Sequence, residues 1–317
     1  MADIPAANLG TISTQLIAQQ YTNLLTPVIQ QGESRTAAST MLKTGLSVRD
    51  VQVIDWLEKM TVRVVKDLVS IRETQVDEAN VSSRWLPAPH LVEHTIRKSA
   101  QFNLLTLVDE DSAIRSAQAK AFMTHMDKEF YDAALGNAIT NIVNVDEVEG
   151  VSPQGITSPY SFVELPGANT ITAQAGQTMT ELVDEVLGKI DGKDVDTNEN
   201  PVIVYINSKA KAALFKDPRY DNWNQMGTQV LGSGDMANYR GVKFVRLSDT
   251  DVFGGSNKLL VVAGKPVCVG IWSDLSTKID ILPEHSYARQ IYTSMSMAAT
   301  RLDEERVFAI DITNLEA

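Results

Sequence analysis

A segment of about 30 residues without proline, 113–142, constrains the fold of this chain more than any other feature. Within it Phe122, Met126 and Phe130 recur every fourth residue, which is the spacing of one face of an α-helix. Acidic residues at 109–111 suit the positively polarised first turn of such a helix. The helix would be about 45 Å long, whereas helices of compact domains average about 11–12 residues. The segment therefore predicts a spine helix that runs along a flat, elongated molecule.

The composition is that of a folded, acidic protein. Of 317 residues, 44% are hydrophobic and 21% are charged, and the formal net charge is -12. No basic run occurs, which argues against a protein that grips nucleic acid through its phosphates, so a DNA partner would be enclosed rather than tightly bound. The single cysteine, Cys268, excludes an internal disulfide and a cysteine-based metal cluster. No basic residue precedes Arg35 and no apolar stretch could span a bilayer, so we expect neither a secretory signal nor a membrane partner.

Two extended segments around a polar stretch predict a long β-hairpin. Residues 47–71 and 90–107 are read mainly as strand, while 74–89 contains serines, an asparagine and prolines and is read as a loop. A two-stranded ribbon is poorly stable alone, so we expect it to lie across a neighbouring subunit. Because Trp and Arg are over-represented at binding hot spots, Arg84, Trp85 and Leu86 are candidate anchors at the tip of this loop.

The middle of the chain predicts a compact subdomain of helices and strands. Thr178 and Glu181 form a capping box in front of an apolar helical face that ends near Gly192. A strand at 202–206 leads to Asn207 or Ser208, either of which suits the N-cap of a short helix. Further strands are expected at 242–247, 258–263 and 267–271. At the C-terminal end, 291–297 and 308–312 alternate in polarity around a charged turn, which predicts a long antiparallel pair.

The chemical motifs do not assemble a catalytic site. His90, Glu93 and His94 match the H-x-x-E-H pattern of inverted zinc proteases, but that pattern needs a helix. The surrounding sequence predicts a strand, in which Glu93 would point away from both histidines. A glycine-containing stretch at 232–237 lacks the strand and helix of a dinucleotide site. We therefore predict no enzyme, no cofactor and no metal site, with a zinc hydrolase built on the H-x-x-E-H residues as the alternative of another class.

Three segments together carry a resemblance to a known family. The segment WLPAPH at 85–90 followed by VDED at 108–111, the segment VYINS at 204–208, and the segment YTSMSMAATR at 292–301 resemble the major capsid proteins of tailed bacteriophages, which have the Hong Kong 97-type shell fold. The resemblance covers the chain from about residue 30 to its C-terminus, and none of the segments is diagnostic by itself.

The resemblance implies an α+β fold with an N-terminal arm, an extended β-hairpin loop, a long spine helix, a peripheral antiparallel sheet and a mixed α/β axial domain. The implied regions are an arm at 1–60, an extended loop at 61–108, a peripheral domain with the spine helix at 109–177, an axial domain at 178–274 and a return to the peripheral sheet at 275–317. Inter-subunit contact candidates are Arg84, Trp85, Leu86, His90 and Trp223.

The resemblance also implies a role and partners. Such subunits form the hexamers and pentamers of an icosahedral or prolate head that encloses double-stranded DNA without sequence-specific binding. Scaffolding, portal and decoration proteins are the expected partners, and the virion is the expected location. An encapsulin-type compartment shell is the alternative of the same structural class. Some family members crosslink subunits through a loop lysine, but 74–89 contains none and the nearest are Lys66 and Lys98, so we expect no crosslink.

Overall fold

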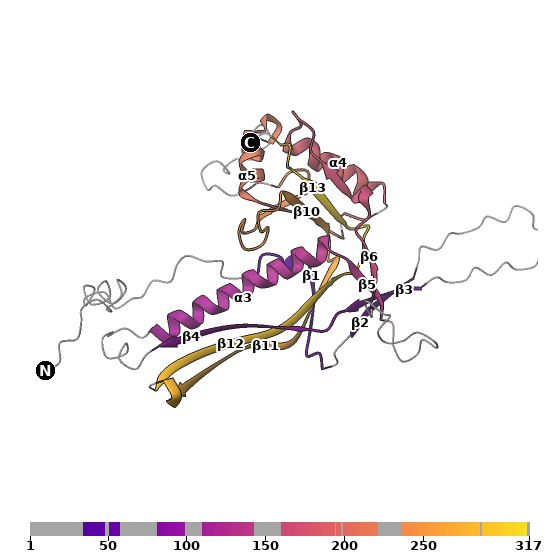
Figure 1. Cartoon of the computed structure of the whole chain (residues 1–317). Coiled ribbons are helices and arrows are strands. Elements are labelled where there is room, and N and C mark those ends of the chain that lie inside the picture. The colour runs from indigo at the N-terminus through magenta and orange to yellow at the C-terminus, as the bar shows by residue number, and fades with distance from the viewer. Residues whose placement is uncertain are drawn as a thin grey trace, which may run out of the picture.

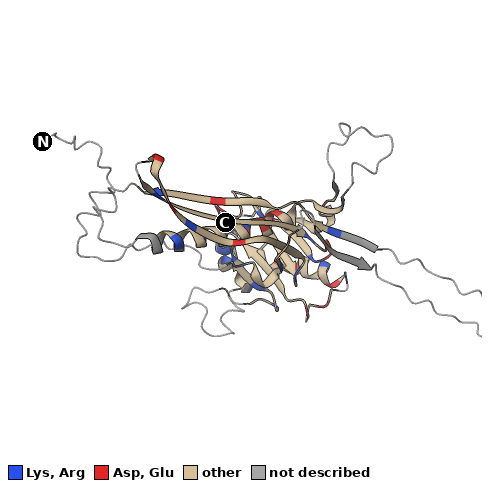
Figure 2. Ribbon diagram, turned by 90° about the horizontal axis from the view of Figure 1, so that it is seen from below, with Lys and Arg blue, Asp and Glu red and all other residues tan. Residues whose placement is uncertain are grey.

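The computed structural model describes residues 34–47, 51–57, 81–98, 110–142, 160–193, 195–197, 199–220, 236, 238–285 and 287–315. These residues form three β-sheets, which are joined along one long helix (Figure 1). Seen from below, the molecule is elongated, and acidic and basic residues are interspersed along it (Figure 2). No helix in the described part of the chain is both long and apolar enough to cross a membrane.

The expected spine is helix α3, Glu110–Leu135. It begins within the acidic cluster, as predicted, but it ends earlier than residue 142. The N–H of Gly136 closes the last turn by donating to the Asp132 carbonyl at 2.8 Å, and a Cβ at this position would lie 2.7 Å from that oxygen. The chain then continues as strand β5, Ala138–Ile142. The prediction of helix for 138–142 was therefore wrong.

The spine helix lies along a four-stranded sheet with the order β1-β11-β12-β4 (Figure 1). Phe122, on the predicted apolar face of the helix, is buried against Ile271, Met295 and Met297 of this sheet. Strand β11 is parallel to β1, whereas β12 is antiparallel to both of its neighbours. The strands are β1, Thr40–Thr44; β4, His90–Lys98; β11, Val267–Leu282; and β12, Ala288–Arg301.

The alternation predicted for 291–297 is confirmed, because Ile291, Thr293, Met295 and Met297 are all buried. The predicted strand at 267–271 was too short. Strand β11 continues to Leu282 as an exposed ribbon. Its polar residues carry no strand pattern, and this part of the chain is a strand because its backbone pairs with β12. A single-turn helix, η5 at Pro283–His285, connects the two long strands.

A second, five-stranded sheet has the order β7-β13-β10-β8-β9 and packs with two helices (Figure 1). The Thr178–Glu181 capping box is confirmed by reciprocal hydrogen bonds of 3.4 and 3.2 Å, and Asn207 caps α5 by accepting from the Ala210 N–H at 2.8 Å. The elements are β7, Thr170–Thr172; α4, Met179–Asp191; β8, Val202–Ile206; α5, Ser208–Lys216; β9, Lys243–Arg246; β10, Lys258–Ala263; and β13, Val307–Asp311.

The last strand corrects an expectation about pairing. Strand β13 pairs with β10 and β7, and not with the strand at 291–297. Polarity alternation reports which face of a strand is buried, but it does not identify the neighbouring strand. The spine helix reaches this second sheet as well, because the Phe130 ring packs edge to face on Tyr205 with the ring centres 5.6 Å apart. One helix therefore joins the two large sheets.

A third sheet has the order β2-β3-β5-β6, and its antiparallel strands β2 and β3 form the hairpin base (Figure 1). The strands are β2, Val51–Leu57; β3, Val81–Leu86; β5; and β6, Tyr160–Val163. The interpretation of 74–89 as a loop was wrong for 81–86, which pair with both β2 and β5. Residues 58–80, between β2 and β3, lie outside the described residues, as do 1–33.

Part of the expected N-terminal arm belongs to the body of the protein. Residues 40–44 are an edge strand of the long sheet, and a short helix, η2 at Ala37–Ser39, precedes them. The buried carboxylate of Asp127, on the spine helix, accepts hydrogen bonds from the hydroxyls of Ser34 and Thr36 at 2.7 and 2.8 Å. These bonds fasten the start of the described chain to the spine.

Candidate assembly surfaces

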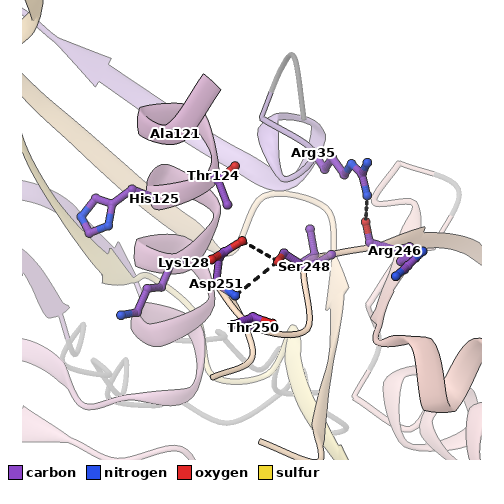
Figure 3. A pocket seen from close by; sticks show the side chains of 10 residues that line it. Arg35, Ala121, Thr124, His125, Lys128, Arg246, Ser248, Thr250 and Asp251 are labelled. Carbon is purple, nitrogen blue, oxygen red and sulfur yellow. Dashed lines mark hydrogen bonds between the residues drawn. The ribbon is translucent and has the colours of Figure 1, made fainter. Parts of the chain in front are cut away.

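A pocket lies between the spine helix and the loop after β9. It has a volume of about 750 Å³, and its lining includes Arg35, Lys128, Arg246, Ser248 and Asp251 (Figure 3). Ser248 and Asp251 bond each other, with Oγ to Oδ2 at 2.8 Å. The Ser248 hydroxyl donates to a carboxylate within its own turn and not to an imidazole, which is not the Ser-His pairing of acyl transfer. The pocket is a polar cleft on the surface of a subunit.

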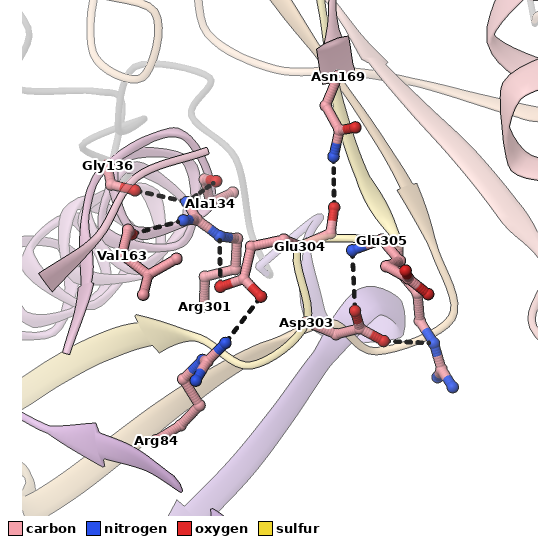
Figure 4. A network of polar contacts seen from close by, with 10 residues as sticks. Arg84, Ala134, Gly136, Val163, Asn169, Arg301, Asp303, Glu304 and Glu305 are labelled. Atoms are coloured by element: carbon pink, nitrogen blue, oxygen red, sulfur yellow. Dashed lines mark hydrogen bonds and ion pairs between the residues drawn. The ribbon is translucent and has the colours of Figure 1, made fainter. Parts of the chain in front are cut away.

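A buried ionic network lies where the three sheets meet. Glu304 stands in the turn between β12 and β13 and contacts two arginines: Arg84 Nη2 at 2.8 Å and Arg301 Nε at 3.6 Å (Figure 4). The side chain of Arg301 is fully buried, and those of Arg84 and Glu304 are 8% and 17% exposed. Burial lowers the pKa of Arg301, and the nearby Glu304 carboxylate partly offsets this. The network therefore places one negative charge between two positive ones in a poorly solvated site.

Arg301 also binds the backbone of two other elements. Its Nη1 donates to the carbonyls of Ala134 and Gly136, at the end of the spine helix, and its Nη2 donates to the Val163 carbonyl at 3.0 Å (Figure 4). Because a helix leaves its last carbonyls without helical partners, this guanidinium caps the spine. The sequence pattern predicted only a charged turn at 301–305 and missed this role, since charged turns are usually solvated.

Two of the predicted contact residues are packed inside the subunit. Leu86 is fully buried with Cys268 and Leu302, and Arg84 belongs to the ionic network. The expectation that Arg84 and Leu86 stand at the tip of a projecting loop was wrong, because both lie in β3 at the base of the hairpin. Trp85 is half-buried in the same strand. Trp223 lies outside the described residues.

The close approach of β3 explains a glycine in the long sheet. A Cβ on Gly270 of β11 would lie 2.7 Å from Cδ1 of Leu86 and 2.9 Å from Cδ1 of Leu46. Only a residue without a side chain allows these leucines to pack directly on the strand. This contact fixes the hairpin base to the long sheet.

The H-x-x-E-H residues separate as the strand reading predicted. They lie in β4, where Glu93 accepts from the Tyr292 hydroxyl at 2.9 Å and His94 Nδ1 contacts the Gln118 amide at 3.0 Å. His90 is turned instead to Glu129 of the spine helix, with Nε2 to Oε1 at 3.3 Å. The alternative of a zinc hydrolase built on His90, Glu93 and His94 is therefore wrong.

Large apolar side chains remain exposed along the long sheet and beside it. Leu91 of β4 and Ile281 of β11 are each 60% exposed, and Ile279 and Leu42 of the same sheet are 39% and 53% exposed. Phe162 of β6 and Tyr287, next to η5, are also exposed. Such a distribution on an elongated chain is typical of a surface that another protein covers.

A long helix on a four-stranded sheet, a second sheet with its own helices and a third sheet that contains the hairpin base define the Hong Kong 97-type class of phage capsid subunits. The chain has 11% identity and a TM-score of 0.67 to a chain of the cyanophage Pam1 capsid asymmetric unit, with 98% of each chain covered. A chain from Microbacterium phage Oxtober96 is 14% identical with a TM-score of 0.66, over 98% of this chain and 99% of that one. The capsid of cyanophage P-SCSP1u gives 12% identity and a TM-score of 0.64, over 94% and 93%.

The sequence family of the chain agrees with this structural class. Residues 12–314 match the family described as phage capsid protein, and the chain belongs to that family. No curated protein sequence matches it. Membership of this family makes the protein a structural component of the phage virion and not an enzyme.

Proposed function

We propose that this chain is the major capsid protein of a tailed phage and forms the hexamers and pentamers of an icosahedral or prolate head around double-stranded DNA. The observation that carries the proposal is the capsid subunit fold over nearly the whole chain, together with membership of the capsid protein family. The proposed regions are the arm, extended loop, peripheral domain and axial domain. The long sheet with the spine corresponds to the peripheral domain and the five-stranded sheet to the axial domain.

The exposed apolar side chains support lateral association. Burial of a side chain such as Ile281 against a neighbour would contribute about 1.5–3 kcal/mol, and the same surface recurs in every copy of a closed shell. Strands β2 and β3 are an antiparallel pair, and a two-stranded ribbon that continues from them would be stabilised by lying on the next subunit. Of the contact candidates, Trp85 is half-buried and the His90 side chain is 48% exposed, so a neighbouring subunit could still contact the exposed part of each.

The acidic charge supports enclosure of DNA rather than tight binding. With a net charge of -12, the subunit as a whole repels phosphates over about 8–10 Å at moderate salt. Scaffolding, portal and decoration proteins are proposed as further partners. The expectation that subunits are not crosslinked stays a prediction. The absence of lysine from 74–89 no longer supports it, because the connection between β2 and β3 is an earlier segment. The segment between β2 and β3 is 58–80, which contains Lys59 and Lys66.

Assembly can be tested by expressing the full chain with the scaffolding protein of its phage and imaging the product by negative-stain microscopy. We expect shells or capsomer rings from the wild type, and none or far fewer from Ile281→Asp. Asp280→Asn, on the neighbouring exposed position of β11, should assemble normally because it removes no apolar surface. A wild-type chain that stays monomeric at every concentration and salt, with scaffold present, would refute the proposal.

A further inference from the structure

We propose that His90, His125 and Glu129 bind a divalent transition-metal ion of the zinc type, which pins the edge strand β4 to the spine helix. The three ligand atoms lie within 4.8 Å of one another. His125 and Glu129 are one helical turn apart on α3, and His90 is the first residue of β4, so two separate elements contribute. This inference does not rest on the proposed function, since such a site would serve the subunit whatever it assembles into.

The distances fit tetrahedral coordination. Glu129 Oε1 lies 3.3 Å from His90 Nε2 and 3.4 Å from His125 Nε2. In a tetrahedral zinc site with bonds of about 2.0–2.1 Å, two ligand atoms are roughly 3.3–3.4 Å apart. The imidazole rings stand at 87° to each other with their centres 6.2 Å apart, so they do not stack in parallel and their edges can converge on one point. Two imidazoles and a carboxylate are a ligand set that zinc-type ions accept.

The state of His125 supports the same conclusion. Its Nε2 atom is buried and makes no hydrogen bond within the described part of the chain, although the Glu129 carboxylate lies beside it. A buried polar atom without a hydrogen bond is costly, and a bound cation would satisfy it. The His90 side chain is 48% exposed, so the site opens to water, which can supply a fourth ligand.

The bound ion would have a mechanical effect on the sheet. Strand β4 is at the edge of the long sheet and pairs only with β12 among the described strands. Besides that ladder, the Gln118 contact with His94 already joins it to the spine. A metal at His90, four residues before His94 on the same face of the strand, would strengthen the contact of His90 with Glu129 at the end of β4 that follows β3. The motif noticed in the sequence thus contributes one histidine to a site whose other ligands come from a distant helix.

The test is a metal titration of the purified, metal-free full chain with Zn²⁺ and Co²⁺ by calorimetry and visible spectroscopy. We expect one ion per chain and the absorption bands of tetrahedral Co²⁺, with no competition from excess Mg²⁺ because nitrogen ligands disfavour it. His90→Ala, His125→Ala and Glu129→Gln should each weaken binding by at least about tenfold. Zn²⁺ should raise the melting temperature of the wild type and leave that of His125→Ala unchanged.

His285→Ala is the matched control, because His285 lies in the exposed η5 and should leave binding intact. His90 is half exposed, so His90→Ala retains the fold and carries the test alone if His125→Ala does not fold. Absence of stoichiometric Zn²⁺ or Co²⁺ binding by the wild type would overturn the proposal. Equal affinity in His90→Ala and wild type, or loss of binding in His285→Ala, would overturn it as well.

Discussion

Replacing Glu304 with Gln would show whether the buried charge between the two arginines stabilises the junction of the sheets. The substitution keeps the size of the side chain and removes its charge. Arg301 is fully buried and Arg84 is 8% exposed, so neither guanidinium would gain solvent in exchange. The two positive charges would then face each other across a neutral amide.

The expected loss follows from these exposures. Removing one partner of a buried ion pair costs about 3–5 kcal/mol, because the remaining charge is left uncompensated. For domains of 150–250 residues, 1 kcal/mol shifts the melting temperature by about 2–4 °C, and larger chains shift less per unit of energy. The lower figure gives a decrease of roughly 6–10 °C for Glu304→Gln.

The assay is thermal and urea unfolding of the purified subunit. Glu305→Gln is the matched control, because the neighbouring Glu305 is exposed and such surface changes are usually within about 0.5 kcal/mol. The double variant Arg84→Leu with Glu304→Gln should recover part of the loss, since it removes the repulsion on Arg301. Equal melting temperatures for Glu304→Gln and Glu305→Gln would show that the network contributes nothing and would refute this reasoning.

Three further predictions concern single side chains. Gly270→Ala should lower the free energy of unfolding by about 1–3 kcal/mol, because its Cβ would overlap Leu86. In urea unfolding, Gly270→Ala should cost less when Leu86→Ala is also present. Full additivity of the two substitutions would contradict the contact. Burial opposes ionisation of Asp217, but hydrogen bonds from Thr180 outweigh this effect and lower the pKa of Asp217. The ionised carboxylate therefore stabilises the fold above the unfolded pKa of about 3.9. This stabilisation is lost as the pH falls through the lower pKa of the folded state. The stability difference between wild type and Asp217→Asn should therefore be larger at pH 7 than at pH 3, and a pH-independent difference would contradict it. Burial raises the pKa of Cys268 to about 11, so a maleimide should label it at pH 7.5 only after unfolding, and rapid labelling of the native subunit would count against this packing.

Elements with a local signal could be predicted from the sequence. The capping box of α4, the apolar strand β8 and the alternation of β12 each depend on neighbouring residues, and the structure confirms them. Strand β3 could not be recognised in this way. Its serines and the following prolines resemble a loop, and it is a strand because β2 and β5 pair with it on both sides.

The functional contacts depended on distant parts of the chain. Glu304 looked like a solvated residue of a turn because its partner Arg84 is 220 positions away. His125 and Glu129 have helical spacing, but only the position of His90 in β4 makes them a group. The resemblance to capsid proteins predicted the architecture well, since it depends on the whole order of elements rather than on any one contact.

The arrangement of the C-terminal strands has a consequence for synthesis of the protein. Strand β12 is a central strand of the long sheet, and β13 is internal to the five-stranded sheet. Neither sheet is complete until these two strands are in place, so the closing pairings of both sheets are among the last contacts that the chain can form. Chains truncated before residue 288 should therefore expose both sets of strand edges and depend on chaperones. Because copies without these strands lack both closed sheets, we expect only copies that contain them to assemble.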